Sequence, residues 1–172
     1  MNRIIITDYQ PVHQPHFETL NRQWIEKHFF LEEIDRYVLS HPGEAILDKG
    51  GAILMALYDG EVAGTVALKK AGSDVYEFTK MAVYETFRRR GIAEALSQAA
   101  FEKAAQLGAG KIILYTQSGL QPAILLYKKL GFRQVPLEPG VYQRADVKME
   151  IDLPVKTMEY EHQAGAGNGG TR

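Results

Sequence analysis

The sequence predicts an α/β fold of the mixed α+β kind, built on a single mixed sheet. Two observations carry this prediction. The first half of the chain places two amphipathic helical patterns before an antiparallel meander of strands, and the second half alternates strand, helix and strand. Alternation of that kind predicts a parallel pair of strands joined by a right-handed crossover. One sheet must therefore hold both parallel and antiparallel neighbours.

Length and composition fit one compact domain. The chain has 172 residues, of which 45% are apolar and 24% charged, the balance of an ordinary globular protein. It has no cysteine, which excludes disulfides, iron–sulfur clusters, thiolate zinc sites and a cysteine nucleophile. Twenty basic and 21 acidic residues give a net charge of −1, which does not favour a nucleic-acid partner.

The sequence shows no targeting or membrane signal. Only three consecutive apolar residues, Ile4–Ile6, precede the return of polar residues, and no later apolar run approaches the roughly 18 residues of a membrane span. We therefore expect a cytoplasmic protein without a membrane partner. We also expect a domain over residues 1–155 and a C-terminal extension over 156–172. From about residue 164 this extension is rich in glycine and has nothing to bury, so we expect it to be flexible.

The first half of the chain predicts a short strand, two helices and three further strands. The short strand covers 3–7, and apolar residues at helical spacing then fit two helices between Pro15 and His41, ending at His41-Pro42-Gly43. Asp59-Gly60 separates two apolar runs and predicts a β-hairpin, because a type I′ turn needs positive φ at both central positions. A third strand of this meander covers 75–83.

The second half predicts two helices and two strands. Apolar residues from Ile92 onward recur with a period of about 3.6, and Gly108 lies where a left-handed residue would end that helix. Residues 111–116 form a continuous apolar run that suits a strand buried on both faces. A second helix begins near Pro122 and ends at Gly131, and the alternating segment 147–153 predicts the last strand.

The turn before the long helix predicts an anion site. Three consecutive arginines, Arg88–Arg90, crowd this turn, where the open backbone N–H groups and about half a positive charge of a helix N-terminus favour an anion. Gly91 and Ala93 leave room for a phosphate or pyrophosphate to approach the backbone. A basic, solvated turn without a ligand is the alternative. Neither GxxxxGK[ST] nor GxGxxG is present, which disfavours nucleotide triphosphatases and dinucleotide oxidoreductases.

Two motifs in this half of the chain resemble those of a known family. Arg88-x-x-Gly91-x-Ala93 matches the pattern [QR]-x-x-G-x-[GA], and the run PAILLYKKLGF over 122–132 is similar to A-x-x-LYxKxGF. The first motif is weak alone, but together with the second it resembles the GNAT superfamily of acetyl-CoA-dependent N-acyltransferases over roughly residues 4–153. The resemblance implies the GNAT fold, a central mixed sheet with helices on both faces.

The resemblance also implies how acetyl-CoA binds as co-substrate. In the family the fourth strand is bulged and splays from the fifth, and the pantetheine arm lies in the gap. Backbone groups of Met81, Ala82 and Val83 would then pair with the pantetheine. The pyrophosphate would be held by the N–H groups of Arg88, Arg89, Arg90, Gly91, Ile92 and Ala93. Many members carry Asn seven residues before the helix tyrosine, where this chain has Leu120, so that contact is not implied.

Two residues are candidates for the chemistry. Glu77 lies six residues before the end of its strand, where some GNAT enzymes place a general base that often acts through water. A strand glutamate paired with a lysine or arginine is the alternative. Tyr127 matches the family's general acid, or else it packs in the core. A phenol titrates near 10 and a thiol near 8.5, so complete proton transfer would be uphill by about 2 kcal/mol. A strong hydrogen bond to the developing thiolate is the firmer expectation.

The remaining candidates concern the acceptor pocket and a metal. In GNAT enzymes the first two helices usually wall this pocket, so some aromatic residues that would otherwise be core are candidates: Trp24, His28, Phe29, Phe30 and Tyr37. Tyr142 and Arg144 are candidates for the same pocket. No metal is expected, because His13-x-x-His16 offers only two neutral ligands without a nearby carboxylate. Gln117-Ser118-Gly119 lacks the frame of a nucleophile elbow.

The resemblance implies an N-acetyltransferase that transfers an acetyl or other small acyl group from coenzyme A to a primary amine by direct attack. A small-molecule amine is the first choice of acceptor and a protein amine the second, and the protein would act as a monomer or homodimer. Two other classes stay open. A non-catalytic acyl-CoA-binding sensor or regulatory module would bind the donor without turnover, and a pure interaction protein would not bind coenzyme A.

Overall fold

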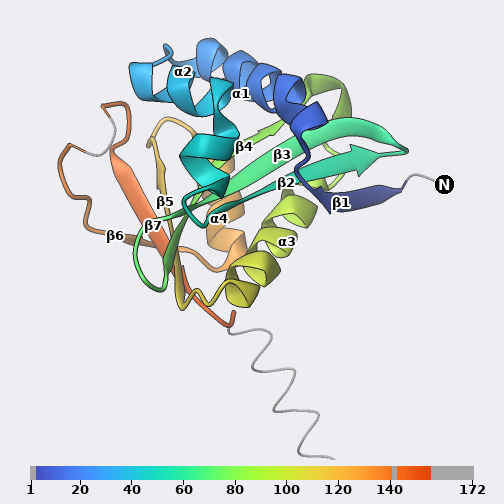
Figure 1. The fold of residues 1–172 in the computed structure, drawn as a ribbon. Coiled ribbons are helices and arrows are strands. Elements are labelled where there is room, and N and C mark those ends of the chain that lie inside the picture. The colour runs from blue at the N-terminus through green and yellow to red at the C-terminus, as the bar shows by residue number, and fades with distance from the viewer. Residues whose placement is uncertain (1–2, 141–142, 156–172) are drawn as a thin grey trace, which may run out of the picture.

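The computed structural model describes residues 3–140 and 143–155. In these ranges seven strands form one sheet in the order β1-β2-β3-β4-β5-β7-β6, with four α-helices packed on it (Figure 1). The elements are β1 (Ile4–Asp8), α1 (Gln14–His28), α2 (Glu33–Ser40), β2 (Ala52–Tyr58), β3 (Glu61–Lys70), β4 (Val75–Val83), α3 (Ile92–Gln106), β5 (Lys111–Thr116), α4 (Gln121–Leu130), β6 (Arg133–Val135) and β7 (Val147–Asp152). Short helical turns lie at Pro11–His13, Gly43–Leu47 and Glu85–Phe87.

The sheet is mixed, as predicted. β1 to β4 form an antiparallel meander, β4 and β5 run parallel, and β7 is antiparallel to both β5 and β6. The predicted hairpin joins β2 to β3, and its central residues Asp59 (φ 50°) and Gly60 (φ 87°) both have the positive φ that a type I′ turn requires. The predicted parallel strand–helix–strand unit is β4-α3-β5.

Side chains that alternate along the strands build a core on each face of the sheet. In β2, Ile53 and Met55 pack in the core under α1 and α2, whereas Leu54 and Ala56 pack in the core under α3 and α4. Figure 1 shows α1 and α2 over one face, with α3 and α4 on the other. The predicted arrangement, helices on both faces of a mixed sheet, is confirmed.

The sequence prediction differs from the structure in three places. β6 was not predicted, because its three residues are exposed or half-buried and carry no apolar pattern. The helical stretch does not end at His41-Pro42-Gly43, since a wide helical turn over Gly43–Leu47 follows and buries Ala45 and Ile46. Phe30 and Tyr37 are not core residues. Their side chains are 66% and 45% exposed, because they lie on the solvent side of the α1–α2 corner.

None of the helices in the described ranges combines the length and apolar character that a bilayer span requires. The predicted extension over 156–172 lies outside the described residues.

Candidate active site

β4 and β5 are paired over a short distance only. Residues 75–77 pair with 111–113, and no pair joins the rest of β4, 78–83, to the rest of β5, 114–116. The second half of β4 thus keeps β3 as its neighbour on one side and has no ladder partner from β5 on the other. A ligand with amide groups can take up that free edge, because backbone N–H and C=O groups require partners.

A β-bulge turns β4 at the start of this gap. Thr65 pairs with Ala82 and Ala67 pairs with Thr79, so β4 spends one more residue than β3 between these two pairs. Lys80, inside the bulge, has φ 55°, and a non-glycine residue in this left-handed region costs roughly 1–3 kcal/mol. Bulges bend the strand that carries them. The bulged and splayed fourth strand that the family resemblance implies is therefore present.

The gap between β4 and β5 opens into a cavity of about 170 Å³. Its walls come from α1, β4, β5, α4 and the segment 144–145. Glu77 and Tyr127, the two candidates for the chemistry, both line this cavity. The structure thus brings together a carboxylate and a phenol that are far apart in the sequence.

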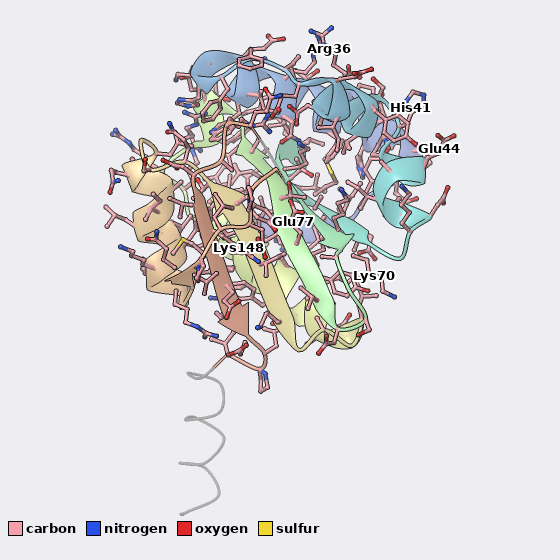
Figure 2. All side chains as sticks on the ribbon, turned by 90° about the vertical axis from the view of Figure 1, so that its left-hand side faces the viewer. Arg36, His41, Glu44, Lys70, Glu77 and Lys148 are labelled. Carbon is pink, nitrogen blue, oxygen red and sulfur yellow. The ribbon has the colours of Figure 1, made fainter. Side chains whose placement is uncertain are left out.

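Glu77 is only 7% exposed, although it is charged and lies near the middle of the sheet (Figure 2). The strand register places Glu77, Tyr115 and Lys148 on one face of the sheet, and Lys148 Nζ lies 5.8 Å from the centroid of the Tyr115 ring. Burial raises the pKa of Tyr115, and the negative charge of Glu77 acts in the same direction. The Glu77 carboxylate therefore lies close enough to these groups to influence their charge.

Tyr127 packs its ring in the core at the edge of the same cavity. The ring makes edge-to-face contacts with Phe78 and Phe132, at centroid distances of 6.0 and 5.9 Å. Burial raises the pKa of Tyr127 to about 12. Against a thiol near 8.5, complete proton transfer from this phenol would be uphill by about 5 kcal/mol. Tyr127 is therefore suited to donate a hydrogen bond to a thiolate rather than to give up its proton.

The predicted anion turn leads into α3. Gly91 caps the helix with φ 78°, in the left-handed region, and no side chain of the described residues caps this end. A Cβ at Gly91 would meet no atom of the described residues within 4 Å, so the space in front of the turn is open. The arginine side chains do not all face this space. The Arg90 guanidinium lies 4.8 Å from the Tyr58 ring centroid, and Arg88 lies 4.0 Å from Glu85.

A buried group of charges stands at the other side of the cavity. We call it the Asp35 cluster: Glu32, Asp35, Lys80 and Arg144. Asp35 Oδ1 accepts hydrogen bonds from Lys80 Nζ at 2.7 Å and from Arg144 Nη2 at 3.1 Å. Asp35 Oδ2 accepts from Arg144 Nη1 at 2.7 Å and from the backbone N–H of Glu32 at 3.0 Å. Lys80 and Arg144 line the cavity.

The charge of Asp35 is held by these partners. Its side chain is 0% exposed, and burial alone would raise its pKa. The hydrogen bonds and positive charges of Arg144 and Lys80 outweigh burial and lower the pKa of Asp35 to about 2. Asp35 therefore stays ionised in the folded protein down to strongly acidic pH.

Comparison with known proteins follows the geometry. Residues 3–132 match the sequence profile described as "Acetyltransferase (GNAT) family". The chain belongs to the GNAT acetyltransferase family. Family and enzyme class are those that the motifs predict.

Curated relatives of this GNAT chain carry acetyltransferase names. An uncharacterized N-acetyltransferase, YjgM, from Escherichia coli is 31% identical, covering 59% of this chain and 63% of its own length. YvbK, an uncharacterized N-acetyltransferase from Bacillus subtilis, is 32% identical, covering 66% of this chain and 75% of the relative. Human N-acetylaspartate synthetase is 31% identical over 63% of this chain but only 34% of the synthetase. The match to the first of these spans less than two thirds of its length, and the match to the third about one third.

Solved GNAT structures share the fold. A GNAT-family acetyltransferase from Staphylococcus aureus has a TM-score of 0.78 at 18% identity, covering 88% of this chain and 99% of the other. PaiA N-acetyltransferase from Thermoplasma acidophilum, solved in complex with coenzyme A, has a TM-score of 0.68 at 16% identity, with coverage of 87% and 99%.

The GNAT structure places the sequence-predicted residues unevenly around the cavity. Trp24, Phe29 and Arg144 line it. His28, Phe30 and Tyr37 are not among the residues that line it, and Tyr142 lies outside the described residues. Leu120, where many members have Asn, does line it.

Sequence reasoning missed Asn21, Asp35 and Lys80. Asn21 is 2% exposed, lines the cavity and donates from Nδ2 to the Phe17 carbonyl at 2.9 Å. Asp35 lies three residues after Glu32, a spacing that marks a capped helix start. Nothing in the sequence joins Asp35 to Lys80 and Arg144, which lie 45 and 109 positions away.

Proposed function

We propose that this chain transfers an acetyl group from acetyl-CoA to a primary amine by direct attack. In this proposal Glu77 accepts the proton of the amine and Tyr127 donates a hydrogen bond to the leaving thiolate. The observation that carries it is the meeting of a buried carboxylate and a buried phenol in one cavity, at the gap between β4 and β5.

The donor fits the long axis of this gap. The backbone of Met81, Ala82 and Val83 lies on the part of β4 that has no partner in β5, so it suits the amide groups of a pantetheine arm. The open N–H groups at the start of α3 lie just beyond the strand and suit a pyrophosphate. Two structural neighbours, PaiA and an aminoglycoside 6′-N-acetyltransferase, were solved with coenzyme A, which supports the same donor here.

The acceptor amine has to lose a proton. An alkyl amine with a pKa near 10.4 is neutral in roughly one molecule of 2,500 at pH 7. Glu77, directly or through one water, takes the proton as the amine nitrogen attacks the carbonyl carbon of the thioester. The C–N bond forms, the C–S bond breaks, and negative charge gathers on sulfur. A hydrogen bond from Tyr127 stabilises that charge, and the thiolate then takes a proton from solvent.

The size and walls of the cavity support a small-molecule acceptor. Its volume is about 170 Å³, and the acceptor side is walled by the rings of Trp24 and Phe29, with Asn21 between them on α1. A small amine can be enclosed there, so that water is kept from the reacting groups.

A two-step experiment tests the proposal. Thermal unfolding with and without acetyl-CoA first measures donor binding, and a panel of small amines and peptide N-termini is then assayed for release of free coenzyme A thiol. We expect stabilisation by acetyl-CoA and turnover with at least one small amine. Stabilisation without turnover on any amine would instead favour a binding module, and no stabilisation would contradict the donor site itself.

A further inference from the structure

The Asp35 cluster joins three parts of the chain at the acceptor side of the cavity. Asp35 lies in the first turn of α2, Lys80 in the bulge of β4, and Arg144 in the segment that precedes β7. Lys80 and Arg144 line the cavity, whereas Asp35 is fully buried and is not among the lining residues. The cluster therefore contacts the cavity through its two cations.

Asp35 has no capacity left for a substrate. Each of its oxygens accepts two hydrogen bonds, from Lys80 and Arg144 at Oδ1 and from Arg144 and the Glu32 backbone at Oδ2. A carboxylate offers about four such acceptor positions. Any influence of Asp35 on a bound molecule must therefore pass through Lys80 and Arg144.

The two cations need a common anion to stand side by side. The side chains of Lys80 and Arg144 are only 8% and 18% exposed, so water screens their repulsion poorly. Arg144 also donates to the carboxylate of Glu32, but Asp35 is the anion that both cations share. Lys80 in addition holds a left-handed backbone conformation, which persists only where surrounding contacts impose it.

The segment that carries Arg144 is tied at two points. Asp146 accepts hydrogen bonds from the backbone N–H and the hydroxyl of Ser118, at 2.7 and 2.6 Å, just beyond the end of β5. Arg144 ties the same segment to α2 through Asp35 and Glu32. The segment thus spans from β5 to α2 along the cavity, and its α2 end depends on the Asp35 cluster.

We infer that Asp35 is a positioning residue for the acceptor amine. It holds the β4 bulge at Lys80 and the segment at Arg144 in the arrangement that forms the acceptor wall, without contacting the amine itself. This inference rests on the proposed function, because it requires an amine acceptor in the cavity.

The test compares Asp35→Asn with a matched control, Glu150→Gln. Glu150 also pairs with two cations, Arg133 at 2.7 Å and Lys111 at 3.5 Å, but it is not among the residues that line the cavity. For each protein the KM of the amine is measured at saturating acetyl-CoA, and the Kd of acetyl-CoA by calorimetry. In Asp35→Asn we expect the amine KM to rise at least tenfold, with kcat changing less than KM. The Kd of acetyl-CoA should stay within threefold, and Glu150→Gln should change neither constant.

A second variant covers the case in which Asp35→Asn does not fold. The double variant Asp35→Asn/Lys80→Met removes opposite charges together, so no buried ammonium loses its anion, and Arg144 still loses Asp35. The same rise in amine KM is expected. An amine KM within twofold of wild type in the folded variant overturns the inference, and so does an equal weakening of amine and acetyl-CoA. Wild-type protein that binds acetyl-CoA but acetylates no amine would contradict the proposed function instead, and the inference with it.

Discussion

The carboxylate of Asp35 accepts a hydrogen bond from Lys80 Nζ at 2.7 Å, with the two side chains only 0% and 8% exposed. Removing one partner of a buried ion pair leaves the other charge without compensation and costs about 3–5 kcal/mol. The pair therefore matters for stability as well as for the shape of the cavity.

The lowered pKa of Asp35 predicts an acid-labile contribution to stability. The pKa falls from 3.8 to about 2 on folding, so the contribution is fully present above pH 4 and is lost as the pH falls through about 2. Its size is about 2 kcal/mol. Urea unfolding at pH 5, 3.5 and 2.5 should show the wild type losing stability more steeply than Asp35→Asn. Parallel losses in the two proteins would assign the acid sensitivity to other carboxylates.

Glu77→Gln should lower kcat/KM by about 100-fold at neutral pH, the low end for loss of a general base. The amide has the size of the carboxylate but cannot accept the proton of the amine. Activity should recover partly as the pH rises, because more of the amine is already neutral. The measurement is kcat/KM from pH 6 to 10, with Glu150→Gln as the control. A pH profile of Glu77→Gln that overlays that of the wild type would reassign Glu77 to a structural role.

Tyr127→Phe should lower kcat by about tenfold or more, if the hydroxyl contributes at least 1.4 kcal/mol in the transition state. The ring contacts with Phe78 and Phe132 remain, so folding and acetyl-CoA affinity should change little. Because the pKa of Tyr127 is about 12, the wild type should show no loss of kcat below pH 10 that Tyr127→Phe abolishes. Full kcat in Tyr127→Phe, measured where the chemical step limits the rate, would exclude the hydroxyl from the reaction.

The turn at Gly91 should govern donor binding. Acetyl-CoA at about 100 times its Kd should stabilise the wild type by about 2.7 kcal/mol, and Gly91→Val should remove most of that shift by crowding the phosphate. The φ of 78° at Gly91 also strains any side chain there, so the control is Gly108→Val. Gly108 has φ 89° at the opposite end of α3 and is equally open. Both variants should lose intrinsic stability, but only Gly108→Val should keep the acetyl-CoA shift.

Elements with a strong local signal could be predicted from the sequence. The bounds predicted for β4 (75–83) and β5 (111–116) agree with the structure, because turn residues and an apolar run mark them. The Asp59-Gly60 hairpin and the end of α3 before Gly108 follow from residues whose backbone conformation the turn itself requires. β6 has three residues and no apolar pattern, and only its pairing with β7 makes it a strand.

The candidate site could be predicted in part for the same reason. Glu77 and Tyr127 lie in or near motifs that local spacing reveals, and both line the cavity. The Asp35 cluster is a tertiary arrangement of residues from α2, β4 and the segment before β7, so no local pattern encodes it. The roles of Glu77, Tyr127 and the backbone at 81–83 and 88–93 stay predictions.

The short ladder between β4 and β5 divides the sheet into two blocks, β1 to β4 and β5 to β7, that are sewn together by three residue pairs alone. A donor lying in the open part of that seam would act as an additional strand and complete the stitching. Its binding would then restrict how far the blocks move against each other, and one wall of the cavity belongs to each block. Donor binding would thus set the width of the cavity before the amine arrives, which favours an order of addition with acetyl-CoA first.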